Sequence, residues 1–236
     1  HDVHMCKTLR LLTRKFGNDG YAFFFRLREL LGMTSNHNYS VENEIDWLDF
    51  NDQVGLDEDK AKNILEIGCN DGTFASNFDK KKITCIEPCG DVAIEAKKKG
   101  LKVYVKYFDD LLVKKLLKDH KKFDMIFSAN TITHISNYNS VFSNISQILT
   151  EHGTLIIEEP SLLETIKKNS YDQFYNEHIY VFSTIALQNI LKKNNLEIYD
   201  VENINVHGGS NRYYIKKIKN KKIKLSLRLK RNMILE

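Results

Sequence analysis

The stretch ILEIGCNDGTF, residues 64–74, decides the fold class of this chain of 236 residues. It begins with an apolar run typical of a buried strand, which a glycine-rich turn and a predicted helix follow. Gly68 and Gly72 carry no Cβ atom, so the backbone of the turn can approach a ligand closely. The glycine spacing differs from the GxGxxG pattern of a dinucleotide-binding loop, which argues against a dinucleotide cofactor.

Beyond this stretch, short apolar runs alternate with helix-like segments. Strands are predicted at 63–67, 83–86, 103–105, 123–127 and 154–157, and helices at 91–99, 109–119 and 139–149. Gly100 and Gly153 follow two of these helices, as glycine commonly does where a helix ends. Strands that alternate with helices predict a parallel α/β sheet with helices on both faces.

The alternation breaks after the fifth predicted strand. Residues 158–183 form a long irregular segment that is rich in aromatic and polar residues. A helix is then predicted at 184–193, and two strands at 196–201 and 212–218. The irregular segment leaves the fifth strand at its carboxyl end, where open α/β sheets hold their ligands. The sequence therefore predicts a Rossmann-like sheet of seven strands with a site at this edge.

Composition and charge divide the chain into three parts. Residues 1–52 are predicted to be a small, mostly helical segment, and a polar stretch at 51–62 separates it from an α/β domain at 56–218. Residues 51–215 hold 20 basic and 23 acidic side chains, which gives no sign of a nucleic-acid groove. Residues 216–236 hold 9 basic side chains and 1 acidic one, so 219–236 is predicted to be a basic C-terminal tail.

The cysteines indicate a reducing compartment. Cys6, Cys69, Cys85 and Cys89 do not form the paired CxxC sets of a zinc site, and they are too scattered for a disulfide framework. We therefore expect free thiols, no metal and a cytoplasmic location. No apolar run approaches the roughly 18 residues that would span a membrane, so no membrane partner is expected. The oligomeric state is left open.

The sequence EIGCNDG at 66–72 resembles motif I of the class I S-adenosylmethionine-dependent methyltransferases. The resemblance implies S-adenosyl-L-methionine as the cofactor and a Rossmann-like class I methyltransferase sheet. Glu87 ends the second predicted strand, and an acid about twenty residues after the glycine loop is placed to accept hydrogen bonds from ribose hydroxyls. The predicted cofactor-binding residues of these two motifs are Glu66, Gly68, Asn70, Gly72 and Glu87.

Two further groups of cofactor contacts are predicted from position alone. Phe108 and Asp109 follow the third strand, where this family contacts adenine, and Asn130 ends the fourth strand together with Ser128 and Ala129. A packing or helix-capping role is an equal alternative for each of them.

Three other stretches are Asn-Thr-Ile-Thr-His-Ile at 130–135, Tyr-Asp-Gln-Phe-Tyr-Asn-Glu-His at 171–178 and Val-His-Gly-Gly-Ser-Asn-Arg at 206–212. Together with motif I, they resemble the sugar C-methyltransferases of deoxysugar biosynthesis over about residues 64–215. The resemblance implies transfer of a methyl group to the carbon α to the ketone of a nucleotide-linked keto-deoxysugar. A packed polar loop and a structural histidine are the simpler readings of Tyr-x-Glu-His and His134.

The chemistry explains why such residues are needed. A carbon next to a ketone becomes a nucleophile only after a base removes its proton, and histidine suits this task near neutral pH. By resemblance and by this chemistry, His178 is the general base. Glu177 orients His178 or the sugar hydroxyls, Tyr175 donates to the enolate oxygen, and His134 binds the sugar or assists protonation. His207, Gly208 and Gly209 are assigned to the wall of the substrate pocket.

The chain also departs from that family. The family carries a zinc-binding N-terminal domain and a further α/β domain after His-Gly-Gly-Ser, and neither is recognisable here. Asn176 replaces a histidine of the family, and Asn211 replaces a leucine. The sequences HDV at 1–3, RKFGNDGY at 14–21 and LREL at 27–30 instead resemble the N-terminal winged-helix-like domain of phage replication initiators. The 6 basic and 7 acidic side chains of residues 1–50 argue against a DNA-binding face.

Three alternatives to the C-methyltransferase hypothesis stay open at this point. The chain could methylate oxygen or nitrogen of another small molecule. It could be a DNA-interaction protein that uses its two ends. It could be a remnant that binds the cofactor without catalysis.

Overall fold

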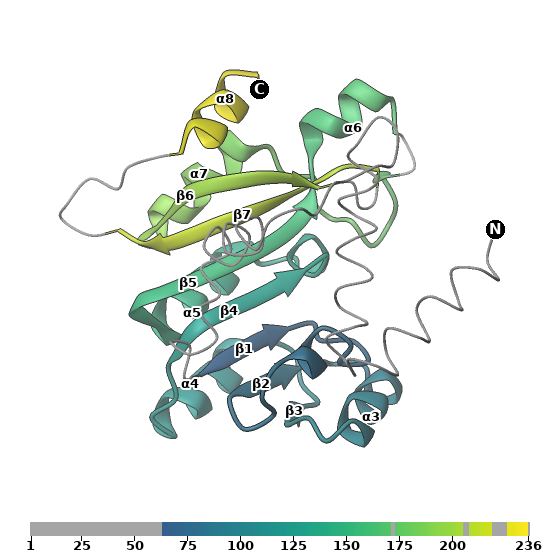
Figure 1. Ribbon diagram of the computed structural model, residues 1–236, viewed down its shortest axis with the longest axis vertical. Helices are drawn as coiled ribbons and strands as arrows, with labels where there is room; N and C mark the ends of the chain where they lie inside the picture. The colour runs from purple at the N-terminus through teal and green to yellow at the C-terminus, as the bar shows by residue number, and fades with distance from the viewer. Residues whose placement is uncertain (1–62, 171–172, 205–207, 219–225, 236) are drawn as a thin grey trace, which may run out of the picture.

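The computed structural model describes residues 63–170, 173–204, 208–218 and 226–235. The described residues form a sheet of seven strands in the order β3-β2-β1-β4-β5-β7-β6 (Figure 1). The strands are β1 Ile64–Ile67, β2 Ile83–Ile86, β3 Val103–Tyr104, β4 Phe123–Ala129, β5 Leu149–Pro160, β6 Leu196–Ile204 and β7 Ser210–Lys217. Strands β1 to β5 are parallel, and β7 runs antiparallel to both of its neighbours. The predicted Rossmann-like sheet of seven strands is confirmed.

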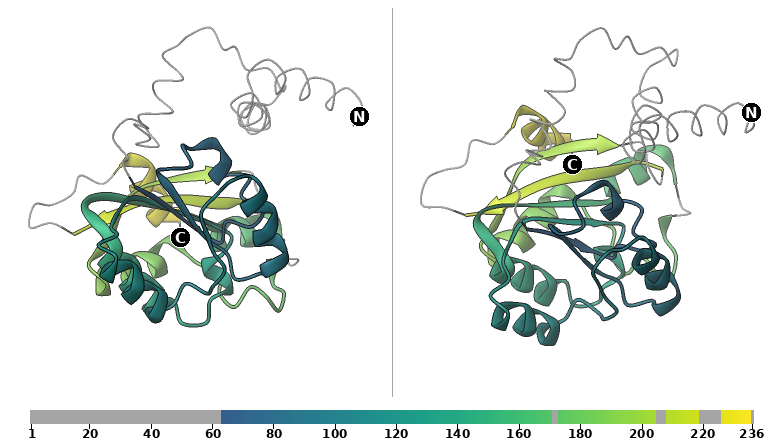
Figure 2. Two further views of the ribbon diagram at one scale, coloured as in Figure 1. Left: turned by 90° about the horizontal axis from the view of Figure 1, so that it is seen from below. Right: turned by 60° about the horizontal axis from the view of Figure 1, so that its bottom comes forward.

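Helices cover both faces of this sheet (Figures 1 and 2). The helical elements are η1 Ala75–Asn77, α3 Gly90–Lys98, α4 Asp110–Lys118, η2 Ile132–His134, α5 Tyr138–Ile148, α6 Leu162–Lys168, α7 Thr184–Lys193 and α8 Leu227–Leu235. Apolar side chains of α4, α5 and α7 join one core cluster with Leu65, Ile126 and Ile157. Ala75 of η1 and Ala96 of α3 join the cluster on the other face. All four residues of β1 and of β2 are buried, as expected for central parallel strands.

The predicted helix after the glycine turn is wrong, because only the single 3-10 turn η1 forms there. Polar side chains in this segment bind the backbone themselves: Ser76 Oγ donates to the Gly72 carbonyl at 2.7 Å, and Asn77 Nδ2 donates to the Phe74 carbonyl at 3.0 Å. Such local bonds compete with a continuing helix. Phe78 then turns to an extended backbone, and β2 begins at Ile83.

The segment around β5 also differs from the prediction. Gly153 lies inside β5 rather than at a helix end, because α5 stops at Ile148 and the chain continues directly into the strand at Leu149. The expected cap at Gly100 is present, with a positive φ of 82° after α3. The irregular segment 158–183 contains α6, which Ser161 caps and Asn169 ends in the left-handed conformation. Its seven residues are too few for a helical period to be visible in the sequence.

The basic C-terminal part is not merely a tail, because α8 packs on the fold. Leu229 of α8 is fully buried, and Asn232 accepts a hydrogen bond from Thr184 Oγ1 of α7 at 2.9 Å. Arg228 pairs with Asp200 of β6. Among the described residues, none of the helices combines the length and the apolar composition needed to cross a membrane. Residues 1–52, with the predicted helices and the resemblance to replication initiators, lie outside the described part.

Candidate functional site

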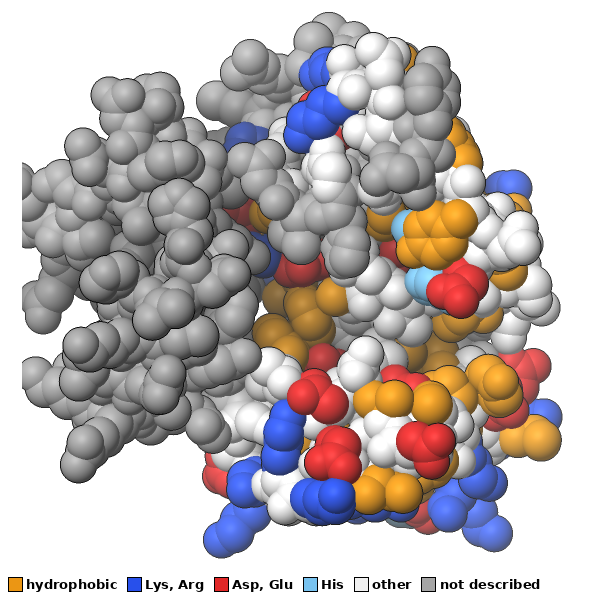
Figure 3. All heavy atoms as spheres, turned by 90° about the vertical axis from the view of Figure 1, so that its right-hand side faces the viewer, with side chains coloured by type: hydrophobic (Ala, Val, Ile, Leu, Met, Phe, Trp, Pro, Cys, Tyr) orange, Lys and Arg blue, Asp and Glu red, His pale blue; other side chains and the backbone are white. Residues whose placement is uncertain are grey.

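The order of the strands places a ligand site beside β1 and β4. From β1 the chain builds the sheet outward through β2 and β3, and it then returns to the other side of β1 for β4. Ligands of open α/β sheets bind at the carboxyl ends of the strands at such a reversal. Figure 3 views this edge, which is hollowed near its centre and carries histidine, acidic and hydrophobic side chains beside the hollow.

The two glycines of the turn have positive φ angles, 76° for Gly68 and 78° for Gly72. A Cβ atom on Gly68 would lie 2.2 Å from Thr131 Oγ1, in the loop after β4. A Cβ atom on Gly72 would lie 2.4 Å from Leu101 Cδ1 and 3.0 Å from Ala96 Cβ. Both glycines are therefore required for internal packing, and Gly68 joins the turn to the loop after β4.

Glu87 holds the turn through its carboxylate. Oε2 accepts a hydrogen bond from the Asn70 amide at 3.0 Å, and Oε1 accepts one from the Cys89 amide at 2.8 Å. An ionised carboxylate has about four acceptor positions. Glu87 can therefore organise the loop and still accept hydrogen bonds from a ligand.

Two further acceptor atoms lie at this edge without a partner. Glu66 Oε2, near the end of β1, and Asn130 Oδ1, directly after β4, are buried and have no hydrogen bond among the described residues. Burial raises the pKa of Glu66 well above its usual range. Buried polar atoms without partners are costly, so these oxygens suit a ligand that brings donor or cationic groups.

The residues assigned by position alone have structural roles. Phe108 is buried in the core cluster that contains Ile86 and Leu112. Asp109 caps α4, with Oδ1 accepting from the Leu112 amide at 2.8 Å. Ser128 Oγ donates to the Ile67 carbonyl and so ties β4 to β1. Cofactor contacts from Phe108 and Asp109 stay predictions beside these packing and capping roles.

The predicted reaction residues His178, Tyr175 and His134 lie together. His178 Nδ1 is 3.0 Å from the Gln173 carbonyl oxygen, and His178 Nε2 is 2.8 Å from the Tyr175 hydroxyl. A carbonyl only accepts, so Nδ1 carries the proton and Nε2 is the basic nitrogen, which accepts from Tyr175. The His134 ring meets the His178 ring edge-on, with centroids 5.1 Å apart. Burial and the neighbouring His178 lower the pKa of His134, against the opposing charge of Glu177.

The segment that carries His178 is fixed to the loop after β4. The Ile179 amide donates to the Thr133 carbonyl at 3.0 Å, and the Tyr180 hydroxyl donates to the Ser136 carbonyl. Tyr180 also packs edge-on against Tyr138 of α5. His134 and His178 are therefore held by one continuous set of contacts, although they lie far apart in the sequence.

Glu177 does not have the first of its two predicted roles. The Gln173 carbonyl and the Tyr175 hydroxyl are the partners of the two His178 ring nitrogens, and the Glu177 side chain is exposed. The second alternative, binding of sugar hydroxyls, stays a prediction. Asn176, where the family has a histidine, is exposed as well.

The Gly208-Gly209 turn lies beside the same cluster. A Cβ atom on Gly208 would meet the Gln173 side chain at 3.4 Å, and one on Gly209 would meet Glu164 Cβ of α6 at 2.8 Å. Lys168 Nζ donates to the Gly208 carbonyl at 2.9 Å. His207 lies outside the described residues. The turn is thus packed between α6 and the segment that orients His178.

Sequence reasoning did not find Gln173, Thr131 or Glu159. Gln173 acts through a backbone carbonyl, which any residue provides, and Thr131 matters because it fills the place of a Cβ atom on Gly68. Glu159 is fully buried near the end of β5 and accepts from the Ile132 amide at 2.9 Å. The available signal for Glu159 was its place directly after the apolar run of β5, next to Glu158.

Residues 36–201 match the protein family described as "Methyltransferase domain", which is more than half of the chain. The chain belongs to this family. The methyltransferase is also 24% identical over 161 residues to the C-methyltransferase NovU of Streptomyces niveus. This similarity covers 67% of the chain but only 38% of the length of NovU.

Solved structures show the same fold at low sequence identity. A methyltransferase of Thermotoga maritima, described as a possible histamine N-methyltransferase, has a TM-score of 0.54 and 17% identity over 89% of this chain and all of its own. Magnesium protoporphyrin IX methyltransferase of Synechocystis, solved with bound S-adenosylhomocysteine, has a TM-score of 0.54 and 12% identity over 89% of this chain and 100% of its own. These likenesses support the fold of the methyltransferase and not an acceptor.

The residues at the carboxyl edge of this methyltransferase domain fit S-adenosyl-L-methionine. Glu66 Oε2 and Asn130 Oδ1 are buried acceptors without a partner, beside the turn of Gly68 and Gly72. The ammonium group of the cofactor matches such acceptors, and its ribose hydroxyls match the remaining acceptor positions of Glu87.

Proposed function

We propose that this methyltransferase transfers a methyl group to the carbon α to the ketone of a nucleotide-linked keto-deoxysugar, with His178 as general base. The supporting observation is the protonation pattern of His178. Its Nδ1 hydrogen is held by the Gln173 carbonyl, which leaves Nε2 as a base at the carboxyl edge of the sheet. The resemblance to sugar C-methyltransferases supports the type of acceptor, and the 24% identity to the C-methyltransferase NovU supports methylation at carbon.

Tyr175 and His178 act as a pair in this proposal. The Tyr175 hydroxyl donates to His178 Nε2 at 2.8 Å, and the Tyr175 side chain is 47% exposed. On acceptor binding, the hydroxyl exchanges this bond for the ketone oxygen and frees Nε2 to remove the α-proton. Developing charge on the enolate oxygen is stabilised by the phenol, while the proton stays on His178. Bound S-adenosyl-L-methionine would supply the electrophilic methyl group of its sulfonium, with S-adenosylhomocysteine as the leaving group.

His134 completes the site from the loop after β4. Burial and the neighbouring His178 lower its pKa, so the ring is neutral when His178 takes a proton. A neutral ring edge-on to His178 is placed to bind a sugar hydroxyl rather than to compete for the α-proton. Glu177 is exposed beside the pair and is assigned to the sugar hydroxyls.

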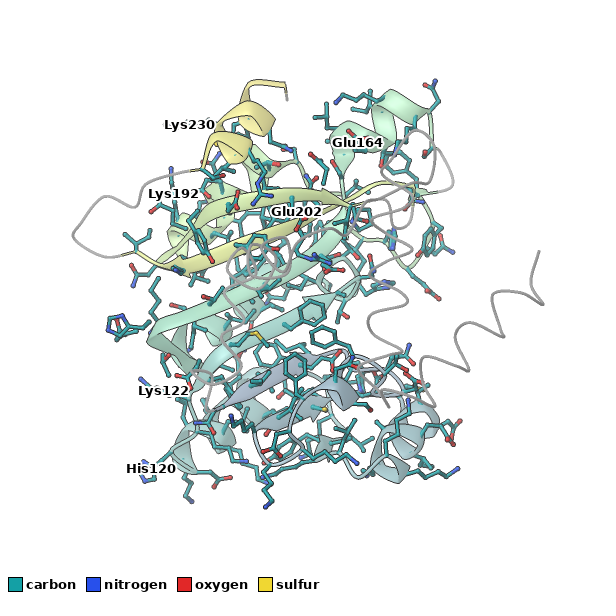
Figure 4. The ribbon with its side chains drawn as sticks, in the orientation of Figure 1. His120, Lys122, Glu164, Lys192, Glu202 and Lys230 are labelled. Atoms are coloured by element: carbon teal, nitrogen blue, oxygen red, sulfur yellow. The ribbon has the colours of Figure 1, made fainter. Side chains whose placement is uncertain are left out.

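Proton exchange tests the proposal without requiring methyl transfer. The enzyme is incubated in heavy water with S-adenosylhomocysteine and a nucleotide-linked 4-keto-deoxysugar, and deuterium at the α-carbon is followed by NMR. We expect exchange in the wild type and a loss of about 10²- to 10⁴-fold in His178→Ala, which still binds S-adenosylhomocysteine. His120→Ala is the control, because His120 is exposed at the opposite edge of the sheet (Figure 4).

Other outcomes lead to the alternatives. Methyl transfer without α-proton exchange would indicate methylation of oxygen or nitrogen. Binding of S-adenosylhomocysteine with neither exchange nor transfer would indicate a non-catalytic remnant. Exchange that is unchanged in His178→Ala would reject His178 as the base.

A further inference from the structure

Glu159 is a fully buried carboxyl group that the reaction does not use. It lies one residue before the end of β5, and its Oε1 accepts from the Ile132 amide at 2.9 Å and from the Thr131 amide at 3.4 Å. Its Oε2 is buried and has no hydrogen-bond partner among the described residues. A carboxyl in such a place is costly unless the bonds it makes are needed.

The bonds of Glu159 replace a missing helix cap. Thr131 occupies the N-cap position of η2, but its side chain makes no capping bond. Its hydroxyl instead donates to the Ala129 carbonyl at 2.9 Å, which places the methyl and hydroxyl groups against Gly68. The first amides of η2 are therefore satisfied by a carboxylate from the neighbouring strand rather than by the cap residue itself.

The loop that Glu159 holds carries both histidines of the proposed site. His134 is the last residue of η2. His178 depends on the same loop because the adjacent Ile179 amide donates to the Thr133 carbonyl at 3.0 Å. A shift of η2 would therefore change the distance between the two rings and their position relative to the glycine turn.

The side chains next to Glu159 on the sheet have other partners, so its carboxyl group bonds to this loop. Asn211 of β7 lies directly opposite Glu159, but its side-chain oxygen accepts from Asn203 Nδ2 and its side-chain nitrogen donates to the Tyr213 hydroxyl. Glu158 alternates to the other face, where it pairs with Arg212, which also contacts Glu202 (labelled in Figure 4). On η2 and the packed segment 173–180, the titratable side chains are His134, Tyr175, Glu177, His178 and Tyr180.

We propose that Glu159 is a positioning residue, which holds η2 through the Thr131 and Ile132 amides and thereby sets the relative placement of His134 and His178. The positions of the two rings follow from contacts in the structure, and only the use of these positions in catalysis rests on the proposed function. Burial raises the pKa of Glu159 to about 7, while the bound amides oppose this rise. The carboxyl group is therefore expected to titrate near neutral pH, and its ionisation can be followed through the amide resonances of the loop.

NMR of the full chain tests the proposal without an acceptor. The Ile132 amide and the histidine ring resonances are followed from about pH 5 to about pH 9 in the wild type, Glu159→Gln and Glu159→Leu. Glu159→Gln keeps an acceptor oxygen but cannot titrate, whereas Glu159→Leu removes the acceptor. Glu151→Gln is the matched control, since Glu151 lies on the same strand, is exposed and pairs with Lys217.

We expect an inflection near pH 7 at the Ile132 amide of the wild type and of Glu151→Gln, and its loss in Glu159→Gln. We also expect the contacts between the His134 and His178 rings to persist in Glu159→Gln and to be lost in Glu159→Leu. An Ile132 amide without this inflection in the wild type would overturn the proposal, as would ring contacts that survive in a folded Glu159→Leu. If Glu159→Leu does not fold, the titration in Glu159→Gln still decides. None of these readouts changes if α-proton exchange fails, so the two proposals fail separately.

Discussion

The two halves of the carboxyl edge are built by different means. Around β1 and β2, a local turn makes the site: two glycines have positive φ angles, and the Glu87 carboxylate accepts hydrogen bonds from the Asn70 and Cys89 amides. Around β4 and β5, side chains from distant segments make the site: His134, the Tyr175–His178 pair and the buried Glu159. A site made from a local backbone turn is encoded by a short motif, whereas a site made from distant side chains depends on the tertiary fold.

The contact between Gly68 and Thr131 joins the two halves, so breaking it gives the largest expected effect. Gly68→Ala places a Cβ atom 2.2 Å from Thr131 Oγ1 at a residue with φ of 76°. We expect a loss of about 3 kcal/mol in the free energy of unfolding from strain and overpacking, measured by denaturant titration. We also expect at least about tenfold weaker binding of S-adenosylhomocysteine by calorimetry, because the turn must move.

Gly90→Ala is the matched control, because a Cβ atom there meets nothing within 4 Å. Adding Thr131→Ala to Gly68→Ala should restore part of the lost stability, since it removes the two nearest clashing atoms. A Gly68→Ala variant as stable as Gly90→Ala would show that the halves are not joined here.

Tyr175→Phe should separate the two halves functionally. It removes the hydroxyl that donates to His178 Nε2, and it leaves the glycine turn and Glu87 untouched. We expect kcat with the keto-sugar acceptor to fall about 100-fold, with unchanged affinity for S-adenosylhomocysteine. Tyr107→Phe, at a 75% exposed tyrosine, is the control. A parallel loss of cofactor affinity would mean that the two halves are coupled through Tyr175.

The smallest expected effect concerns the pH dependence of stability. The folded state raises the pKa of Glu159 from an ordinary value of 4.5 to about 7, so between these values the folded protein binds more protons than the unfolded chain. Stability therefore decreases as pH rises through this window. Relative to wild type, Glu159→Gln should gain about 2 kcal/mol between about pH 5 and pH 8. Denaturant titrations at both pH values measure this gain, and a constant difference would contradict it.

The same contrast explains what the sequence could predict. β2 at Ile83–Ile86 and α7 at Thr184–Lys193 were placed correctly, because apolar runs and helical periodicity are local signals. The prediction that Gly153 follows a helix end was wrong, because glycine also occurs within strands. η1 replaced a helix because Ser76 and Asn77 bind the backbone locally.

The candidate site shows the limit more sharply. Tyr175, His178 and His134 could be grouped from their residue types and from strand order. The tautomer of His178 could not be predicted from the sequence, because it depends on the backbone carbonyl of Gln173, and every residue type has such a carbonyl. The role of Glu159 required knowing that Thr131 is turned toward Ala129 and Gly68 and leaves η2 without its own cap.

The position of β7 also constrains the order in which this molecule assembles. β7 follows β6 in the chain, yet it lies between β5 and β6 in the sheet, so within the described residues β6 reaches the sheet only through β7. During synthesis, β1 to β5 can pair as they leave the ribosome, whereas β6 has no partner strand until β7 has been made. The Gly208-Gly209 turn and its contacts with α6 and Gln173 then form only in the final strand insertion. A nascent chain is therefore expected to complete its cofactor half before its acceptor half.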